Sequence, residues 1–241
     1  MSDNLLLTRL KELENIVAEY RKQEIPGADT GWIADTAAWT YASATTLTIT
    51  GDVTARFPVG TKVKLTQTTV KYFYVVSATY SAPNTTITLT GGSDYSLANA
   101  AITSPYYSYS STPQGFPQAF NYAVTWANIT VGAGTSSGKF IIIGRELFYR
   151  ASFVLGTGSS IDGDVNYLLP CNAVSTGVHN VKITDAGTNT FSAYGDIATN
   201  ISHVRVINSS GTYATYNVIS ATVPMTWATG DSIVATGNYE I

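Results

Sequence analysis

The fold class of this chain is decided by residues 139–155, KFIIIGRELFYRASFVL. Two runs rich in β-branched and aromatic residues, Lys139–Ile143 and Glu146–Leu155, flank the dipeptide Gly144-Arg145. Runs of this composition are typical of strands, and a two-residue connection that contains glycine is typical of a tight hairpin turn. The stretch therefore predicts a pair of antiparallel strands.

Further strand-like runs follow this hairpin, separated by turn residues at a spacing of about ten residues. They are Val165–Leu169, Val181–Thr184, Val204–Ile207, Tyr216–Ile219 and Ile233–Ala235. About seven short strands with regular turn signals are typical of a β-sandwich or jelly roll. We therefore expect residues 120–241 to form a C-terminal β-sandwich, called the second module below.

An alternating pattern upstream predicts another antiparallel unit, the first module, over residues 27–110. Its strand-like runs are Leu47–Thr50, Lys62–Leu65, Lys71–Val75 and Ile87–Thr90. The segment Thr45–Gly51 is echoed by Thr85–Gly91. A single echo indicates two similar strands of one small barrel or sandwich, not a repeat array. The predicted fold class is therefore mainly β.

The segment between the modules has an unusual composition. Residues 105–117, PYYSYSSTPQGFP, contain three prolines and a glycine, which interrupt a long strand ladder. We expect an extended, semi-flexible connector here, and we set the boundary segment between the two modules at residues 111–119. The aromatic residues of the segment are expected to pack on a neighbouring domain or subunit; they are Tyr106, Tyr107, Tyr109 and Phe116.

Residues 1–26, the leader, carry a different pattern. Apolar residues recur at alternating spacings of four and three, which is the seam of a short coiled coil; they are Leu6, Leu10, Leu13, Val17 and Tyr20. Asp3 or Ser2 can cap the helix, and Pro26-Gly27 ends it. A helix this short is marginal alone in water, so we expect sister subunits to bury its seam. Leu5 and Ile16 widen the apolar face, which favours a homotrimer, while packing of the helix on its own β modules is the alternative.

Charge is concentrated in the leader. Nine of the 29 charged residues precede Ile25, which leaves 20 for the remaining 217 positions. A net charge of −3, with no basic run in the β modules, predicts that nucleic acid is not a partner. No apolar run approaches the roughly 18 residues of a membrane-spanning helix, so we expect no membrane insertion. The first residues lack the features of a signal peptide, which predicts maturation in the cytoplasm of the host cell.

The residues offer little for catalysis or metal binding. His179 and His203 do not lie in a metal-binding spacing, and Cys171 is the single cysteine. A triad from Cys171, a histidine and an aspartate is conceivable, but the preceding Leu168–Pro170 indicates a strand end whose thiol is a small core hydrophobe. The run Asp162-Gly163-Asp164 could contribute to a calcium site, which needs six to eight oxygens, and a hairpin turn is the favoured interpretation. We expect no catalytic residue, no metal, no cofactor and no enzymatic activity.

Two parts of the chain resemble known modules. Residues 39–116 resemble a module that recurs in tail-associated proteins of bacteriophages and prophages, through residues 57–67, 70–77 and 99–109. Residues 124–231, from Val124-Thr125-Trp126 to Val223–Asp231, are similar to a β-sandwich of the same kind of protein. These motifs concern packing and turns, and no catalytic residue comes with them.

The resemblance implies a virion component assembled in the bacterial cytoplasm. Such a component is commonly a homotrimeric tail fibre or baseplate protein attached to other virion proteins, and it sometimes contacts a host surface glycan. A capsid decoration, head-fibre or neck-fibre protein and a glycan-binding tip are the alternatives. Exposed aromatic rings can stack on sugars, so the candidate glycan contacts are Tyr106, Tyr107, Tyr109 and Trp126, with plain structural packing as the competing interpretation.

Overall fold

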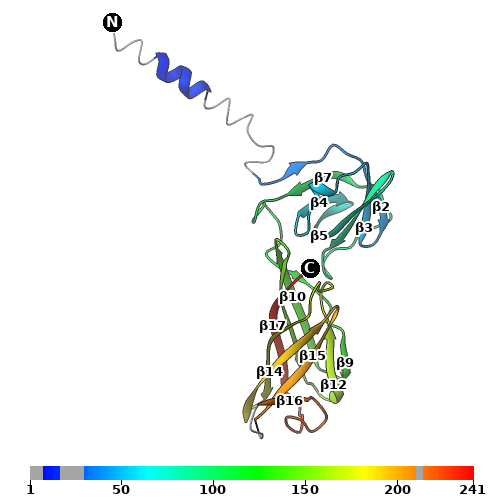
Figure 1. The fold of residues 1–241 in the computed structure, drawn as a ribbon, viewed down its shortest axis with the longest axis vertical. Coiled ribbons are helices and arrows are strands. Elements are labelled where there is room, and N and C mark those ends of the chain that lie inside the picture. Colours follow the sequence, from blue (N-terminus) through cyan, green and yellow to red (C-terminus); the bar gives the residue numbers. More distant parts are fainter. Residues whose placement is uncertain (1–7, 17–29, 210–213) are drawn as a thin grey trace.

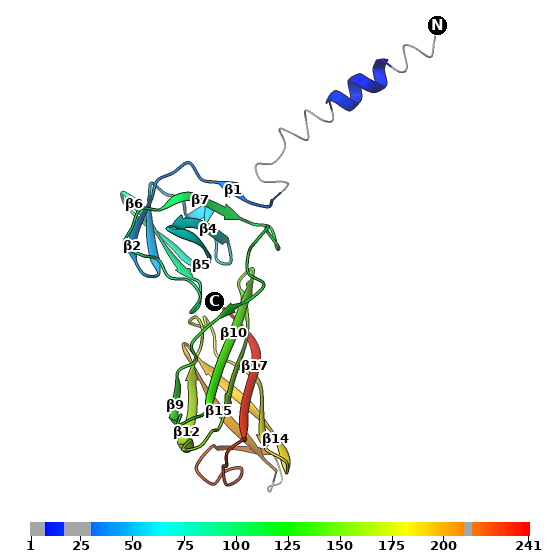
Figure 2. The ribbon, with the colours of Figure 1, turned by 180° about the vertical axis from the view of Figure 1, so that it is seen from behind.

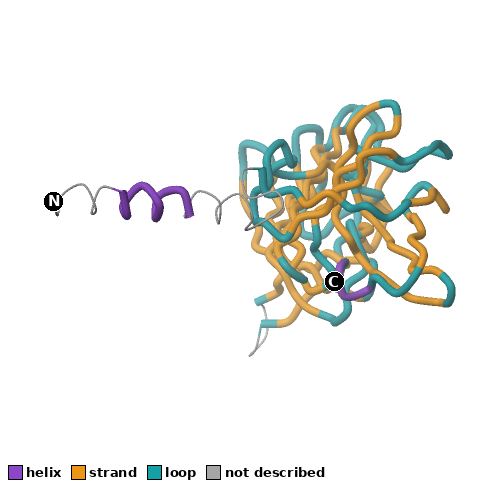
Figure 3. The backbone as a smooth tube through the Cα atoms, turned by 90° about the horizontal axis from the view of Figure 1, so that it is seen from above, coloured by secondary structure: helices purple, strands orange, loops and turns teal. Residues whose placement is uncertain are grey.

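The computed structural model describes residues 8–16, 30–209 and 214–241. Figures 1 and 2 show two β bodies stacked along the long axis, with the C-terminus between them. Residues 8–16 form a helix that lies apart from both bodies, and the view from above shows the same separation (Figure 3). The prediction of a mainly β chain is confirmed.

The first body is an antiparallel sheet with the strand order β1-β7-β4-β5-β6-β3-β2 in the described chain. The strands are β1 (Ile33–Ala34), β2 (Trp39–Ser43), β3 (Thr46–Thr50), β4 (Lys62–Gln67), β5 (Thr69–Ser81), β6 (Asn84–Thr90) and β7 (Thr103–Ser108), and a 3₁₀ turn, η1, spans Thr54–Arg56. One face of the sheet buries an apolar core that includes Leu47, Val63 and Phe73. Alternation along β4 places Val63 and Leu65 in this core and turns Lys62 and Lys64 to the other face.

The second body is also one antiparallel sheet. Its order within the described residues is β8-β10-β11-β17-β13-β14-β15-β12-β9, and β16 pairs with β15. The strands are β8 (Phe120–Asn121), β9 (Trp126–Thr130), β10 (Thr135–Ile143), β11 (Glu146–Val154), β12 (Ser160–Leu168), β13 (Gly177–Asp185), β14 (Asn189–Ala198), β15 (Ile201–Asn208), β16 (Thr215–Val218) and β17 (Ser232–Glu240). The indole nitrogen of Trp126 on edge strand β9 donates to Ser136 Oγ on β10 at 2.9 Å, so the sheet curls until its opposite sides approach.

The hairpin predicted from residues 139–155 is present. Ile143 of β10 pairs with Glu146 of β11, so Gly144-Arg145 is the two-residue connection. Gly144 has a φ of +63°, which a residue with a side chain rarely adopts. The two echoed segments of the first module are also neighbours, because β3 and β6 pair directly, with Leu47 opposite Ile87.

Strand β7 corrects the start of the predicted connector. Residues 103–108 pair with both β4 and β1 and therefore belong to the first sheet. The pairing register shifts between Lys64 and Thr66, which leaves Ser104 and Pro105 together opposite Leu65. A proline cannot donate to a strand ladder, and an irregularity of this kind tolerates it inside a strand.

The second body is sandwich-like, as expected, but its described residues form more strands than the predicted seven or so. It is a single curled sheet whose halves face each other across one core, and this core includes Phe140, Phe153 and Tyr167. Sequence patterns did not predict β8, β9 and β14. The run Asp162-Gly163-Asp164 is not a hairpin turn, because it lies inside β12 where the pairing with β9 shifts register between Ile161 and Asn166.

The two bodies meet through close backbone contacts. A Cβ added to Gly60 would collide with the carbonyl of Gly144, so the first body packs directly on the β10–β11 turn. Asp94 accepts hydrogen bonds from the backbone and side-chain nitrogens of Asn121 at 2.8 and 2.9 Å. Phe116 and Phe120 lie between the bodies, with ring centroids 5.0 and 5.3 Å from that of Tyr74. The junction is therefore a packed interface.

Candidate functional site

The described part of the leader exposes its apolar residues. Every residue of the helix 8–16 is exposed, and the exposed fractions of Leu10, Leu13 and Ile16 are 55%, 57% and 53%. The seam residues Leu6, Val17 and Tyr20 lie outside the described residues. A coiled coil needs further copies of the helix, so the structure of a single chain does not test this prediction.

The three candidate tyrosines lie at and just after the end of β7, with Tyr106 on the face of Lys64 and Tyr107 on the opposite, core face. Tyr106 packs under the ammonium of Lys64, whose Nζ is 4.3 Å from the ring centroid. Tyr107 contacts Phe57 of the first core, with ring centroids 5.6 Å apart. Tyr109 is 58% exposed, and its hydroxyl donates to the carbonyl of Arg56 at 2.8 Å. Of the three rings, Tyr109 is therefore the most available to a ligand.

Trp126 lies on the other body and does not join the tyrosines. Its ring centroid is 4.9 Å from that of Tyr167 and 5.9 Å from that of Phe153, both in the second core. Together with its bond to Ser136, these contacts place Trp126 across the opening between β9 and β10. The structure therefore splits the four predicted glycan contacts between two surfaces.

The acidic pair in β12 is bound by neighbouring side chains. Asp162 accepts hydrogen bonds from Thr130 and Ser160 at 2.8 and 2.6 Å, and these bonds hold its pKa below the ordinary value. Asp164 forms an ion pair with Arg205. Within the described residues, no three His, Cys, Asp or Glu side chains are grouped as metal ligands would be.

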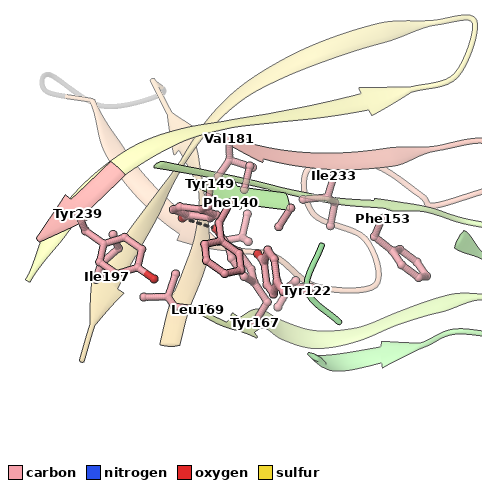
Figure 4. Close-up of a cluster of buried hydrophobic side chains, with 14 of the residues drawn as sticks. Tyr122, Phe140, Tyr149, Phe153, Tyr167, Leu169, Val181, Ile197, Ile233 and Tyr239 are labelled. Carbon is pink, nitrogen blue, oxygen red and sulfur yellow. Dashed lines mark hydrogen bonds between the residues drawn. The ribbon is translucent and has the colours of Figure 1, made fainter. Parts of the chain in front are cut away.

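A buried polar chain of Tyr149, Tyr167 and His179 crosses the second core, and Figure 4 labels the two tyrosines. The hydroxyl groups of Tyr149 and Tyr167 are 2.9 Å apart, and Tyr167 Oη lies 2.7 Å from His179 Nε2. Burial lowers the pKa of His179 to about 4 and raises the pKa of Tyr167 to about 12. Gly195 and Gly237 pack directly against the imidazole, which leaves no room there for a Cβ. These hydrogen-bonded side chains therefore stabilise the core. His179 is only 7% exposed, so a substrate could not reach its imidazole in this arrangement.

Cys171 lies in the loop between β12 and β13, just beyond the predicted strand end, and no histidine partner is found for it among the described residues. The backbone N–H of Cys171 donates to Tyr239 Oη at 3.2 Å, and that hydroxyl donates to the Cys171 carbonyl at 2.9 Å. Burial raises the pKa of the thiol to about 12. A thiol in this state is a poor nucleophile.

A groove lies at the junction of the two bodies and is a further candidate site. It has a volume of about 740 Å³, and three segments far apart in the sequence form its walls: residues 58–62, residues 109–118 and the β10–β11 turn at residues 141–144. Most of the lining is apolar or aromatic, including Val59, Phe116 and Ile141. Binding sites for small ligands are commonly clefts of this size at domain interfaces. We call it the inter-module groove.

Lys62 is the charged residue in the lining of this groove. Its side chain is buried, with 8% exposed, and Nζ donates to the carbonyl of Ser110 at 3.0 Å. The ammonium lies 5.7 Å from the ring centroids of both Tyr74 and Phe116. Burial lowers the pKa of Lys62 below its ordinary value.

Sequence patterns did not reveal this groove. In the run Lys62–Leu65, alternation predicts that both lysines face water. Lys62 is instead covered by the connector, whose Ser110 lies about fifty residues later in the sequence. The aromatic residues of the connector were the available signal, because a purely solvated linker does not need Tyr109 and Phe116.

No protein family, curated protein or solved structure matches this chain. Within the described residues, no helix is both long and apolar enough to cross a bilayer. The described features that bear on function are therefore the exposed helix 8–16, the polar side chains that are already bonded, and the inter-module groove.

Proposed function

We propose that this chain is a non-enzymatic structural protein of a bacteriophage particle, a homotrimer attached to other virion proteins through its N-terminal helices. The observation that carries the proposal is the exposed apolar stripe of the helix 8–16. Leu10, Leu13 and Ile16 are all more than half exposed, and neither of the two buried apolar cores of the β bodies includes them. A contiguous apolar stripe on a short helix favours association.

Three helices suit this stripe better than two. Leu10 and Leu13 lie on the seam, and Ile16 widens the apolar face beside it. A wider apolar face is buried more completely when each helix has two neighbours. The assignment to a phage particle is supported by the resemblance of residues 39–116 and 124–231 to modules of phage tail proteins.

The polar groups support a role without catalysis. Three described groups of the kinds most often used in catalysis are held in structural surroundings. His179 contacts Tyr167, Asp164 pairs with Arg205, and burial raises the pKa of the Cys171 thiol. A catalytic group needs access to a substrate and a pKa suited to proton transfer or nucleophilic attack.

Light scattering during size-exclusion chromatography of the full chain tests the proposal. We expect a particle of three times the chain mass of 25.7 kDa. A variant that carries Leu10→Ser and Leu13→Ser should elute as a monomer with unchanged β circular dichroism, because the seam is lost and both cores remain.

The matched control carries two serines on the polar side of the same helix, Lys11→Ser and Glu12→Ser. Serine lowers the helix propensity in both variants, so only the seam differs. The control should stay trimeric. A monomeric unaltered chain, or a trimer that survives the seam variant, contradicts the proposal.

A further inference from the structure

The inter-module groove holds a positive charge without a counter-charge. Lys62 Nζ has one hydrogen-bond acceptor in the described chain, the carbonyl of Ser110 at 3.0 Å, and none of the ion pairs among the described residues includes Lys62. A lysine ammonium has three donors, so two N–H groups remain for a ligand.

The surroundings of the Lys62 ammonium favour the binding of an anion beside it. The rings of Tyr74 and Phe116 stabilise the cation through their faces, but they do not neutralise it. A buried charge that lacks an ionic partner is unfavourable, and its attraction for an opposite charge is strengthened by the low local dielectric. Lys62 therefore favours an acidic group in the groove.

The walls of the groove indicate the rest of the ligand. Beyond Lys62 they are formed mainly by Pro58, Val59, Phe116, Pro117, Ile141 and Ile143. Ile143 is 61% exposed in this structure, so an occupant would remove apolar surface from water. The lining also has polar side chains, on Thr61, Ser111, Thr112 and Gln118, but apolar surface predominates. A ligand rich in hydroxyl groups would therefore leave part of them unpaired, whereas an apolar body would not.

We propose that the inter-module groove binds a carboxylate ligand with an apolar body, with the carboxylate on Lys62 and the body between Phe116 and the β10–β11 turn. The proposal goes beyond the proposed function, because trimer assembly through the leader does not require an occupied groove. A ligand bound there would contact both bodies and the connector, and it would stabilise their arrangement.

Isothermal titration calorimetry of the full chain tests the proposal with three probes. We expect 4-phenylbutyrate to bind at least tenfold more tightly than 4-phenylbutan-1-ol, which has the same body without the charge. Glucuronate, which has a carboxylate on a hydroxylated ring, should bind more weakly than 4-phenylbutyrate. Equal affinity for the acid and the alcohol, or tighter binding of glucuronate, overturns the proposal.

Two lysine variants locate the site. Lys62→Met keeps the aliphatic stem, removes the charge and should weaken binding of 4-phenylbutyrate at least tenfold. Lys64→Met is the matched control, because Lys64 lies on the same face of β4 but its ammonium contacts Trp32 and Tyr106, outside the groove lining. Unchanged binding in Lys62→Met, or an equal loss in Lys64→Met, contradicts the assignment. If Lys62→Met does not fold, the comparison of acid and alcohol on the unaltered chain still decides.

Discussion

Among single residues, His179 makes the stability of the second body depend on pH. Its imidazole is 7% exposed, and Nδ1 is buried without a hydrogen-bond partner in the described chain. A proton added to this ring would be buried without compensation, which is why its pKa falls from 6.5 to about 4. The unfolded chain therefore takes up the proton at a higher pH than the folded chain does.

The stability of the second body should accordingly fall on acidification. The contribution of His179 to the free energy of unfolding is fully present above its unfolded pKa of 6.5. It decreases as the pH drops toward the folded pKa of about 4. A shift of this size corresponds to about 3 kcal/mol in the free energy of unfolding. Urea unfolding at pH 7, 6, 5 and 4 measures it.

The variant His179→Gln isolates this effect, since glutamine has no titrating group in the range. It should be less stable than the unaltered chain at pH 7, because it fits the space between Gly195 and Gly237 less well. Its difference from the unaltered chain should shrink steadily toward pH 4. Parallel stability curves for the two proteins would show that His179 does not carry the pH dependence.

At the scale of elements, the β10–β11 hairpin depends on one glycine. Gly144 has a φ of +63° and no neighbouring atom within 4 Å of an added Cβ, so an alanine there meets backbone strain without a steric collision. We expect Gly144→Ala to lower the free energy of unfolding by about 1 kcal/mol. Urea unfolding measures the change.

Gly177 provides the control for this prediction. It begins β13 in the same body, has open space around an added Cβ and does not have a positive φ. Gly177→Ala should therefore leave the stability unchanged or raise it slightly. An equal loss in both variants would mean that the conformation of Gly144 is not the cause.

The same elements show how far the sequence predicts this structure. The β10–β11 hairpin and the β3–β6 pair follow from local patterns, since composition, alternation and a turn glycine all agree there. Strand β14 escaped prediction because Ser192, Gly195 and Asp196 weaken its pattern, and Gly195 is needed where His179 packs. The burial of Lys62 could not be predicted because the connector that covers it is distant in sequence.

At the scale of the whole molecule, Gly60 sets the fit between the two bodies. A Cβ at this position would collide with the carbonyl of Gly144, and neither backbone can move without opening the junction. We expect Gly60→Ala to enlarge the radius of gyration in small-angle scattering. Its thermal unfolding should split into two transitions, one for each body.

Gly51→Ala is the control for this prediction, because Gly51 also has a large positive φ, +90°, but no atom lies within 4 Å of its added Cβ. It therefore adds similar backbone strain without the collision. Gly51→Ala should lower the stability of the first body, keep the radius of gyration and keep a single transition. Two transitions in the control, or one in Gly60→Ala, would show that Gly60 does not couple the bodies.

The position of β17 has a consequence for biosynthesis. This strand, Ser232–Glu240, lies between β11 and β13, and its partners in β11 are translated more than seventy residues earlier. Within the described residues the strand ladder between β11 and β13 runs through β17, so this ladder is incomplete until β17 has been synthesised. The second body can therefore close only after translation has passed residue 240, and until then its unpaired strand edges need protection from other chains.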